Sequence, residues 1–148
     1  SDAGNVSANS TAQAILAAPS AVGAKKIVMA SPYTDETNAH EAHYLSGHGI
    51  EVLASTGLSL NTSLENIQKI SRVPPPDVFE HAKSIDKAEA DALLICCTDF
   101  NTFDVIDPLE HELGKPVVSS NSATLWHSLR NAGIEDRLEG LGTLLKNH

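Results

Sequence analysis

The apolar run ALLICC, residues 92–97, ends in Cys96 and Cys97, the two cysteines of this 148-residue chain. Consecutive Cα atoms lie about 3.8 Å apart, closer than an unstrained disulfide allows, so we expect free thiols. Because side chains alternate along a strand, the thiols should face opposite sides of a sheet, with Cys97 and Thr98 at the strand end. A thiol before a helix N-terminus suits a nucleophile or a proton carrier. The alternative, that both cysteines are small buried hydrophobes, has about equal weight.

Other reactive groups form weaker patterns. Seven histidines are present, but His40 and His43 are the only close pair, on an otherwise polar helical segment, which favours solvated side chains over metal ligands. The sequence has no Cys-x-x-Cys, no His-Glu-x-x-His and no phosphate-loop glycine pattern. We therefore expect no metal and no cofactor.

The composition narrows the class of protein. The net charge is −9 and no block of Lys or Arg stands out, which argues against partners such as nucleic acid or an anionic membrane. The apolar runs are far shorter than the roughly 20 residues of a membrane span, and the chain does not open with a basic region followed by an apolar one. We expect a soluble, cytoplasmic protein with reduced thiols.

Four β-type runs, at residues 26–30, 50–54, 92–97 and 116–120, alternate with helical stretches. This alternation predicts an α/β fold with a four-stranded parallel sheet and helices on both faces. Residues 1–10 are small and polar and are expected to form a flexible segment, and residues 11–148 a single lobe. Helices are expected at 11–22, 36–49 after an N-cap at Asp35, 62–72 from a capping box, 77–90 after a break at prolines 74–76, 103–113 and 123–132, with a weaker tail after 134.

Each strand run is followed by hydroxyl, amide or thiol groups, in the segments SPYTDET, STGLSLNTS, CTDFNT and SSNSAT. Ligands of open parallel sheets collect at the carboxyl ends of the strands, and free N–H groups at helix starts suit a small carboxylate there. The same residue types also serve ordinary helix caps and turns, which remains the simpler interpretation of any single one.

Two long segments carry a family resemblance: ASPYTDETNAHEAHYLSGHGIEVL, and ADALLICCTDFNTFDVIDPLEHELGKPVVSSNSATLWHSLRNAGI. Together, over about residues 10–145, they resemble the maleate cis-trans isomerase and arylmalonate decarboxylase branch of the aspartate/glutamate racemase superfamily. The resemblance implies one lobe of a two-lobed α/β fold, without metal or organic cofactor, in which each lobe usually supplies one catalytic cysteine or its equivalent.

The resemblance also implies roles for individual residues. Cys97 matches the second-lobe catalytic cysteine, while Cys96 takes a position commonly held by a small residue such as Ser. Tyr33 matches a tyrosine that contacts substrate. The remaining candidates are substrate-binding residues: Thr98, which offers a backbone N–H and a hydroxyl to a carboxylate, Asn66 with Asn61 as its competitor, and Ser120 and Asn121 of the Ser-Ser-Asn motif.

A chemistry follows from the same resemblance. In the isomerase mechanism a first-lobe thiolate adds to maleate and the second-lobe thiol donates and recovers a proton; racemases and decarboxylases of the superfamily also protonate a carbon beside a carboxylate. Nothing before residue 10 matches the first-lobe segment, so we expect the isolated chain to be inactive or very weakly active. A noncatalytic binding lobe, covered by a first lobe or a second copy, is the alternative.

Overall fold

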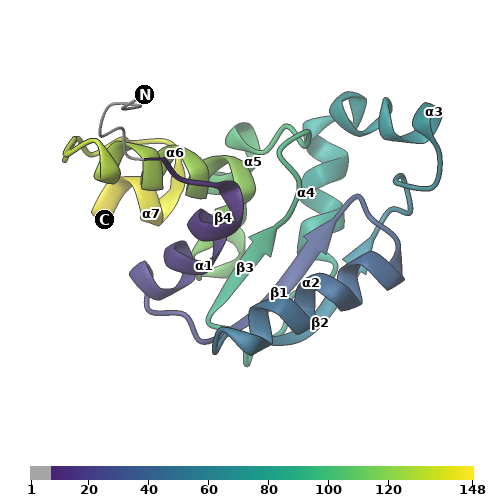
Figure 1. Ribbon diagram of the computed structural model, residues 1–148, viewed down its shortest axis with the longest axis horizontal. Helices are drawn as coiled ribbons and strands as arrows, with labels where there is room; N and C mark the ends of the chain where they lie inside the picture. Colours follow the sequence, from purple (N-terminus) through teal and green to yellow (C-terminus); the bar gives the residue numbers. More distant parts are fainter. Residues whose placement is uncertain (1–7) are drawn as a thin grey trace, which may run out of the picture.

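The computed structural model describes residues 8–148 and has the predicted alternation of strands and helices (Figure 1). Its elements in chain order are α1 (Thr11–Ala21), β1 (Lys26–Ser31), α2 (Asp35–Gly47), β2 (Glu51–Gly57), α3 (Leu64–Ile67), the 3₁₀ turn η1 (Ile70–Arg72), α4 (Pro75–Lys83), β3 (Ala92–Ile95), α5 (Phe103–Leu113), β4 (Val117–Ser119), α6 (Ser120–Asn131) and α7 (Gly142–Asn147).

The four strands form one parallel sheet in the order β2-β1-β3-β4. The central pair, β1 and β3, aligns Met29 with Leu94 and Ala30 with Ile95. From β1 the chain passes through α2 outward to β2, whereas from β3 it passes through α5 outward to β4. The connections therefore leave the central pair in opposite directions, which opens a crevice between the carboxyl ends of β1 and β3.

Helices cover both faces of the sheet, as predicted. On one face, Ile27, Met29 and Leu94 pack against apolar residues of α1, α2, α6 and α7. On the other face, Val28 and Leu93 pack against α4 and α5. In Figure 1, α2 lies in front of β1 and β2. The alternation of strand side chains thus produces two cores, each built mainly from aliphatic residues.

Several helix starts differ from the sequence-based expectation. The N-cap of α2 is Thr34, not Asp35, because the Thr34 hydroxyl accepts the N–H of Thr37. The N-cap of α3 is Ser63, and α4 begins at Pro75, where a missing backbone N–H removes no helical hydrogen bond. The prolines at 74–76 therefore start a helix, which ends at Lys83 rather than continuing to residue 90.

The last third of the chain is also more regular than expected. Helix α6 begins at Ser120 instead of residue 123, because Ser119 caps it in a capping box with Ser122. The expected weak tail contains α7.

Residues 1–7 of the predicted flexible segment lie outside the described residues. Next to them, Asn9 donates to Ser128 Oγ at 3.1 Å and Ser10 caps α1. Within residues 8–148 no helix is both long and apolar enough to cross a membrane.

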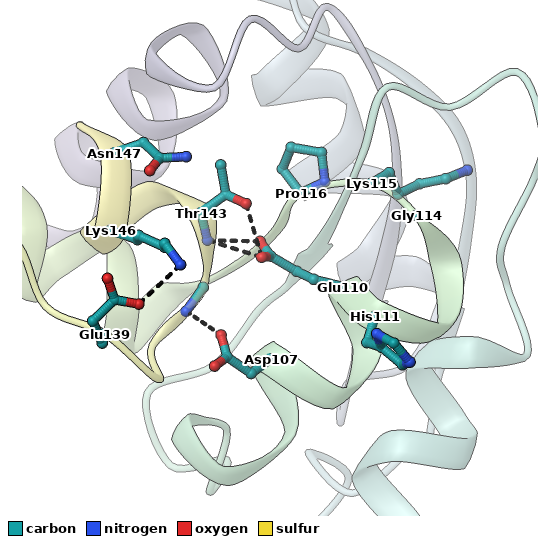
Figure 2. Close-up of a pocket in the computed structure, with 11 residues that line it drawn as sticks. Asp107, Glu110, His111, Gly114, Lys115, Pro116, Glu139, Thr143, Lys146 and Asn147 are labelled. Atoms are coloured by element: carbon teal, nitrogen blue, oxygen red, sulfur yellow. Dashed lines mark hydrogen bonds and ion pairs between the residues drawn. The ribbon is translucent and has the colours of Figure 1, made fainter.

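A hollow of about 490 Å³ lies between α5 and α7, at the amino end of β4 and so at the opposite edge from Cys97 (Figure 2). The Glu110 carboxylate lines this hollow. It accepts hydrogen bonds from the N–H groups of Val117 and Thr143 and from the Thr143 hydroxyl, all within 3.0 Å. Asp107 accepts the N–H of Gly142 at 2.7 Å. These acceptors are occupied by backbone donors and by the Thr143 hydroxyl. The hydrogen bonds form a structural joint that fastens α7 to α5 and β4, and the hollow lies beside this joint.

The joint predicts a stability effect for Glu110→Ala. Removing the carboxylate leaves the Val117 and Thr143 donors without their acceptor, which is expected to lower the free energy of unfolding by about 1–3 kcal/mol. Urea denaturation followed by circular dichroism measures the effect. Glu112→Ala on the same helix, which removes an exposed ion pair with Lys83, serves as the control and should leave the midpoint nearly unchanged. Equal effects of the two substitutions would contradict the joint.

Candidate active site at the carboxyl edge of the sheet

The crevice between β1 and β3 brings together the two residues expected to be catalytic. Tyr33 follows the end of β1, and Cys97 follows the end of β3. The Cys96 N–H still donates to the Ala30 carbonyl at 2.9 Å, which continues the β1–β3 ladder up to the site. Tyr33 packs against the core on one face and Cys97 against the core on the other, so the two residues converge on the sheet edge from opposite sides.

The loop that carries Tyr33 is held on both sides. The Tyr33 N–H donates to the Ser31 hydroxyl at 3.0 Å, and the Tyr33 carbonyl accepts the N–H of Ser59 at 3.0 Å. Asn61 accepts the N–H of Thr34 at 2.7 Å and donates to the Thr37 hydroxyl at 2.9 Å. The exit of β2 thus clamps the exit of β1, and the Asn61 side chain is occupied in that clamp.

Cys97 has an unusual backbone. Its φ is +93°, a conformation that L residues with a side chain rarely adopt, and this explains why β3 ends at Ile95 rather than at Cys97. The Cys97 N–H donates to the Ser120 hydroxyl at 3.2 Å, and its carbonyl accepts the N–H of Phe100 at 3.3 Å. Strained residues of this kind persist where surrounding contacts hold them, often at functional sites.

The segment after Cys97 is fixed by side chains of β4 and α6. The Asn121 amide donates to the Phe100 carbonyl at 2.8 Å and to the Thr102 hydroxyl at 3.3 Å. The Thr102 hydroxyl in turn donates to the Ser119 hydroxyl at 2.9 Å, and both side chains are buried. Ser120 and Asn121, expected to bind substrate, therefore hold the Cys97 loop in place.

The phenol of Tyr33 is electrostatically linked to the thiols. Burial raises the pKa of Tyr33 well above its usual range, and the neighbouring Cys97 thiol raises it further, with smaller contributions from Glu41 and Cys96. Tyr33 therefore remains a protonated hydrogen-bond donor at neutral pH. Burial also raises the pKa of Cys96, whose side chain is 2% exposed, so Cys96 is the inert thiol of the pair.

The other predicted contacts lie farther along the edge. Thr98 is exposed and, with Asn121 and Phe103, lines a hollow of about 490 Å³ beside the Cys97 loop. Asn66 lies on α3, at the periphery of Figure 1, where its amide donates to the Thr62 hydroxyl at 2.9 Å and accepts from Lys69 at 3.0 Å. The structure thus brings Tyr33 and Cys97 together at the crevice and places Thr98 and Asn121 at the neighbouring hollow. It engages Asn66 with Thr62 and Lys69, which flank α3.

Comparison with known proteins decides the family. The sequence model for arylmalonate decarboxylase matches residues 1–145. The chain belongs to the arylmalonate decarboxylase family.

Individual members of this family and their relatives give the same picture. The chain is 29% identical to maleate isomerase from Alcaligenes faecalis, covering 83% of this chain and 47% of that protein. It is 30% identical to arylmalonate decarboxylase from Bordetella bronchiseptica, covering 81% and 49%. The fold matches a cysteine-to-alanine variant of maleate isomerase Iso from Pseudomonas putida S16, solved with maleate, at a TM-score of 0.84 and 25% identity over 91% of this chain and 53% of that one. The chain spans about half the length of these relatives.

Sequence reasoning missed three polar residues behind this arylmalonate decarboxylase-family site. Asn38 of α2 accepts a hydrogen bond from the buried Ser31 hydroxyl at 2.6 Å. His81 of α4 contacts the Ser31 carbonyl through Nε2 at 2.9 Å, and burial lowers the pKa of His81. Glu41 of α2 is partly buried. Positions 38, 41 and 45 lie on one face of a helix, and this spacing was the sequence signal that could have identified Asn38 and Glu41. Among the described residues, no group of three or more His, Cys, Asp and Glu side chains is placed to hold a metal ion.

The clamp on the Tyr33 loop predicts that Gly57 tolerates no side chain. A Cβ at Gly57 would overlap the Tyr33 carbonyl oxygen and lie 2.8 Å from the Asn38 amide nitrogen. Gly57→Ala is expected to cost about 1–3 kcal/mol of folding free energy and to move the Tyr33 and Thr34 amide resonances in ¹H–¹⁵N spectra. Gly47→Ala, where a Cβ meets nothing within 4 Å, is the control. Unchanged Tyr33 and Thr34 resonances in the Gly57 variant would refute the clamp.

The Cys97 loop gives a second prediction. Ser120→Ala removes the acceptor of the Cys97 N–H and is expected to lower the free energy of unfolding by about 1–3 kcal/mol. The Cys97 amide should also exchange faster with deuterium, because its hydrogen bond is gone. Ser128→Ala, at an exposed position of the same helix, removes the acceptor of Asn9 instead and should leave the exchange of the Cys97 amide unchanged. If the Cys97 amide keeps its protection in the Ser120 variant, Ser120 does not position the loop.

Proposed function

We propose that this chain is one lobe of a cofactor-independent, maleate isomerase-like enzyme, in which Cys97 exchanges a proton with a carbon beside a carboxylate. The convergence of Tyr33 and Cys97 on the crevice between β1 and β3 carries the proposal. The proposal is also supported by a relative: the chain is similar to maleate isomerase from Alcaligenes faecalis over 83% of its length.

The residues of the crevice have distinct proposed roles. Cys97 is the proton donor or, alternatively, the nucleophile. Tyr33, protonated at neutral pH, donates a hydrogen bond to a substrate carboxylate. Thr98 contributes its backbone N–H and hydroxyl, and Asn121 lines the same hollow. Ser120 acts through the Cys97 backbone rather than on substrate.

The proposed reaction needs a second group facing Cys97 across the substrate. A thiolate on that side bonds to one alkene carbon of maleate, and the other alkene carbon takes the proton from Cys97. The central bond is then single and rotates. Return of the proton to Cys97 and cleavage of the carbon–sulfur bond release fumarate. Both faces of the alkene must be occupied, and this chain supplies one of them.

Decarboxylation is the second candidate function, favoured by the family model that matches residues 1–145. After loss of CO₂ from an arylmalonate, the same thiol would protonate the resulting enediolate. The two reactions share the Cys97 proton transfer and differ in the group on the opposite side of the substrate.

Binding of a small dicarboxylate tests the site directly on the 148-residue chain. Titration with millimolar maleate is expected to move the amide resonances of Tyr33, Cys97, Thr98 and Asn121, while those of Glu110 and Thr143 at the far edge stay fixed. Phenylmalonate in place of maleate tests the decarboxylase candidate. Shifts confined to the far edge, or none with either ligand, would favour a noncatalytic lobe.

Turnover gives the complementary prediction. Because Cys97 supplies groups on one side of the substrate only, the 148-residue chain alone should not convert maleate to fumarate at ordinary enzyme rates. Proton NMR follows the alkene signals of both isomers, and Cys97→Ser provides the background. Rapid turnover that disappears in Cys97→Ser would mean that the chain contains both sides of the site.

A further inference from the structure

Ser31, the last residue of β1, is a polar residue at the end of an apolar strand. The strand reads KIVMAS, its side chains from Ile27 onward are buried, and Ser31 itself is 0% exposed. Because side chains alternate along a strand, Ser31 shares a face with Ile27 and Met29 and points toward the core beneath α2. A hydroxyl in this position is unfavourable unless it is hydrogen-bonded, since packing there favours an apolar side chain.

The Ser31 hydroxyl makes two hydrogen bonds, one as donor and one as acceptor. It donates to the Asn38 amide oxygen at 2.6 Å, and both side chains are 0% exposed. It accepts the N–H of Tyr33 at 3.0 Å, a contact two residues along that turns the chain as it leaves the strand. Pro32 between them has no backbone N–H, so the Tyr33 N–H is the first donor after the strand. Because the single hydroxyl proton goes to Asn38, an oxygen lone pair is left to accept from Tyr33.

The Ser31 carbonyl connects the same residue to two further elements. His81 of α4 contacts this oxygen through Nε2 at 2.9 Å, and the N–H of Leu58, just beyond β2, donates to it at 3.3 Å. A carbonyl oxygen can only accept, so Nε2 of His81 carries the proton. Asn38 lies on α2 and His81 on α4, and these helices cover opposite faces of the sheet. Ser31 is therefore hydrogen-bonded to both helical layers and to the exit of the neighbouring strand.

These hydrogen bonds lie two residues before Tyr33, whose phenol neighbours the Cys97 thiol. Ser59 and Asn61 hold the far side of the Tyr33 loop, through the Tyr33 carbonyl and the next N–H along the chain. The near side is held by the Ser31 hydroxyl, through the Tyr33 N–H. Since Ser31 is fixed in turn by α2, α4 and the exit of β2, the turn at residue 31 sets the direction in which the Tyr33 backbone leaves the sheet.

We propose that Ser31 is a positioning residue of the candidate site: its hydroxyl, ordered by Asn38, directs the chain out of β1 so that the Tyr33 phenol lies beside Cys97. The role rests on the proposed function, in which Tyr33 donates a hydrogen bond to a substrate carboxylate while Cys97 exchanges a proton. Ser31 acts through the Tyr33 backbone and not on the substrate. Small errors in such placement have large effects on a reaction, because the reacting groups must be aligned.

The first test compares Ser31→Ala with Ser31→Thr. Alanine removes the acceptor of the Tyr33 N–H, so deuterium exchange of this amide should accelerate about tenfold beyond any change in global unfolding, the size of one hydrogen bond. Nuclear Overhauser contacts between the Tyr33 ring and the Cys97 side chain should be lost. Threonine keeps the hydroxyl and suits a strand, so it should retain both signals. Thr143→Val, which removes a hydroxyl hydrogen bond to Glu110 at the far edge, is the control and should change neither.

The second test addresses the ordering of the hydroxyl by Asn38. Asn38→Leu removes the acceptor of the Ser31 hydroxyl and leaves Ser31 in place, so the Tyr33 amide should again exchange faster and the Tyr33–Cys97 contacts should weaken. Because both side chains act through one hydroxyl, the double variant should exchange no faster at Tyr33 than Ser31→Ala does. Additive effects of the two substitutions would contradict this order of action.

Unchanged Tyr33–Cys97 contacts in a folded Ser31→Ala variant would overturn the proposal, because any loss of stability would then be purely structural. If Ser31→Ala does not fold, Asn38→Leu decides by the same criterion. Neither test uses a substrate. If both succeed and maleate causes no shifts in the wild-type chain, the proposed function fails while the role of Ser31 stands. If maleate moves the Tyr33 resonance equally in wild type and Ser31→Ala, the function stands and the positioning role fails.

Discussion

The parallel pairing of β1 with β3 is the constraint on which the rest of the structure depends. These strands are not consecutive in the chain, so the segment from β2 to β3 must cross over β1 and pack α4 on the face opposite to α2. This crossing produces the two cores and also the reversal of connections at which Tyr33 and Cys97 meet. In the observed register, Ala30 aligns with Ile95. A shift of this register by one residue would move the Cys97 thiol away from the Tyr33 phenol and exchange the faces of Cys96 and Cys97.

The site is held by contacts between strand exits that lie far apart in the sequence. Asn61 and Gly57 at the exit of β2 fix the Tyr33 loop, and Ser120 at the exit of β4 fixes Cys97. Each outer strand therefore supports the loop of its inner neighbour. Many of the hydroxyl and amide groups that crowd this edge serve the backbone, whereas the Thr98 side chain is exposed.

The strands and the class of fold could be predicted because aliphatic runs such as KIVMA and ALLICC are visible in the sequence and alternate with helical stretches. The end of β3 could not, since the positive φ of Cys97 accompanies a hydrogen bond that its N–H donates to the Ser120 hydroxyl, 23 positions away. The start of α4 was missed because proline breaks a helix in its interior and begins one at its first position. Tyr33 and Cys97 became candidates through family motifs, whereas Glu41 was not considered because its helix looks polar on every side.

The two cysteines show how one sheet divides chemistry between its faces. Cys96 remains in the β1–β3 ladder, packs in the core beneath α1 and α2, and meets Glu41 there. Cys97 leaves the ladder one residue later with its positive φ and turns toward the crevice. The peptide bond between them thus joins the covered core on one face of the sheet to the open edge where the strands end.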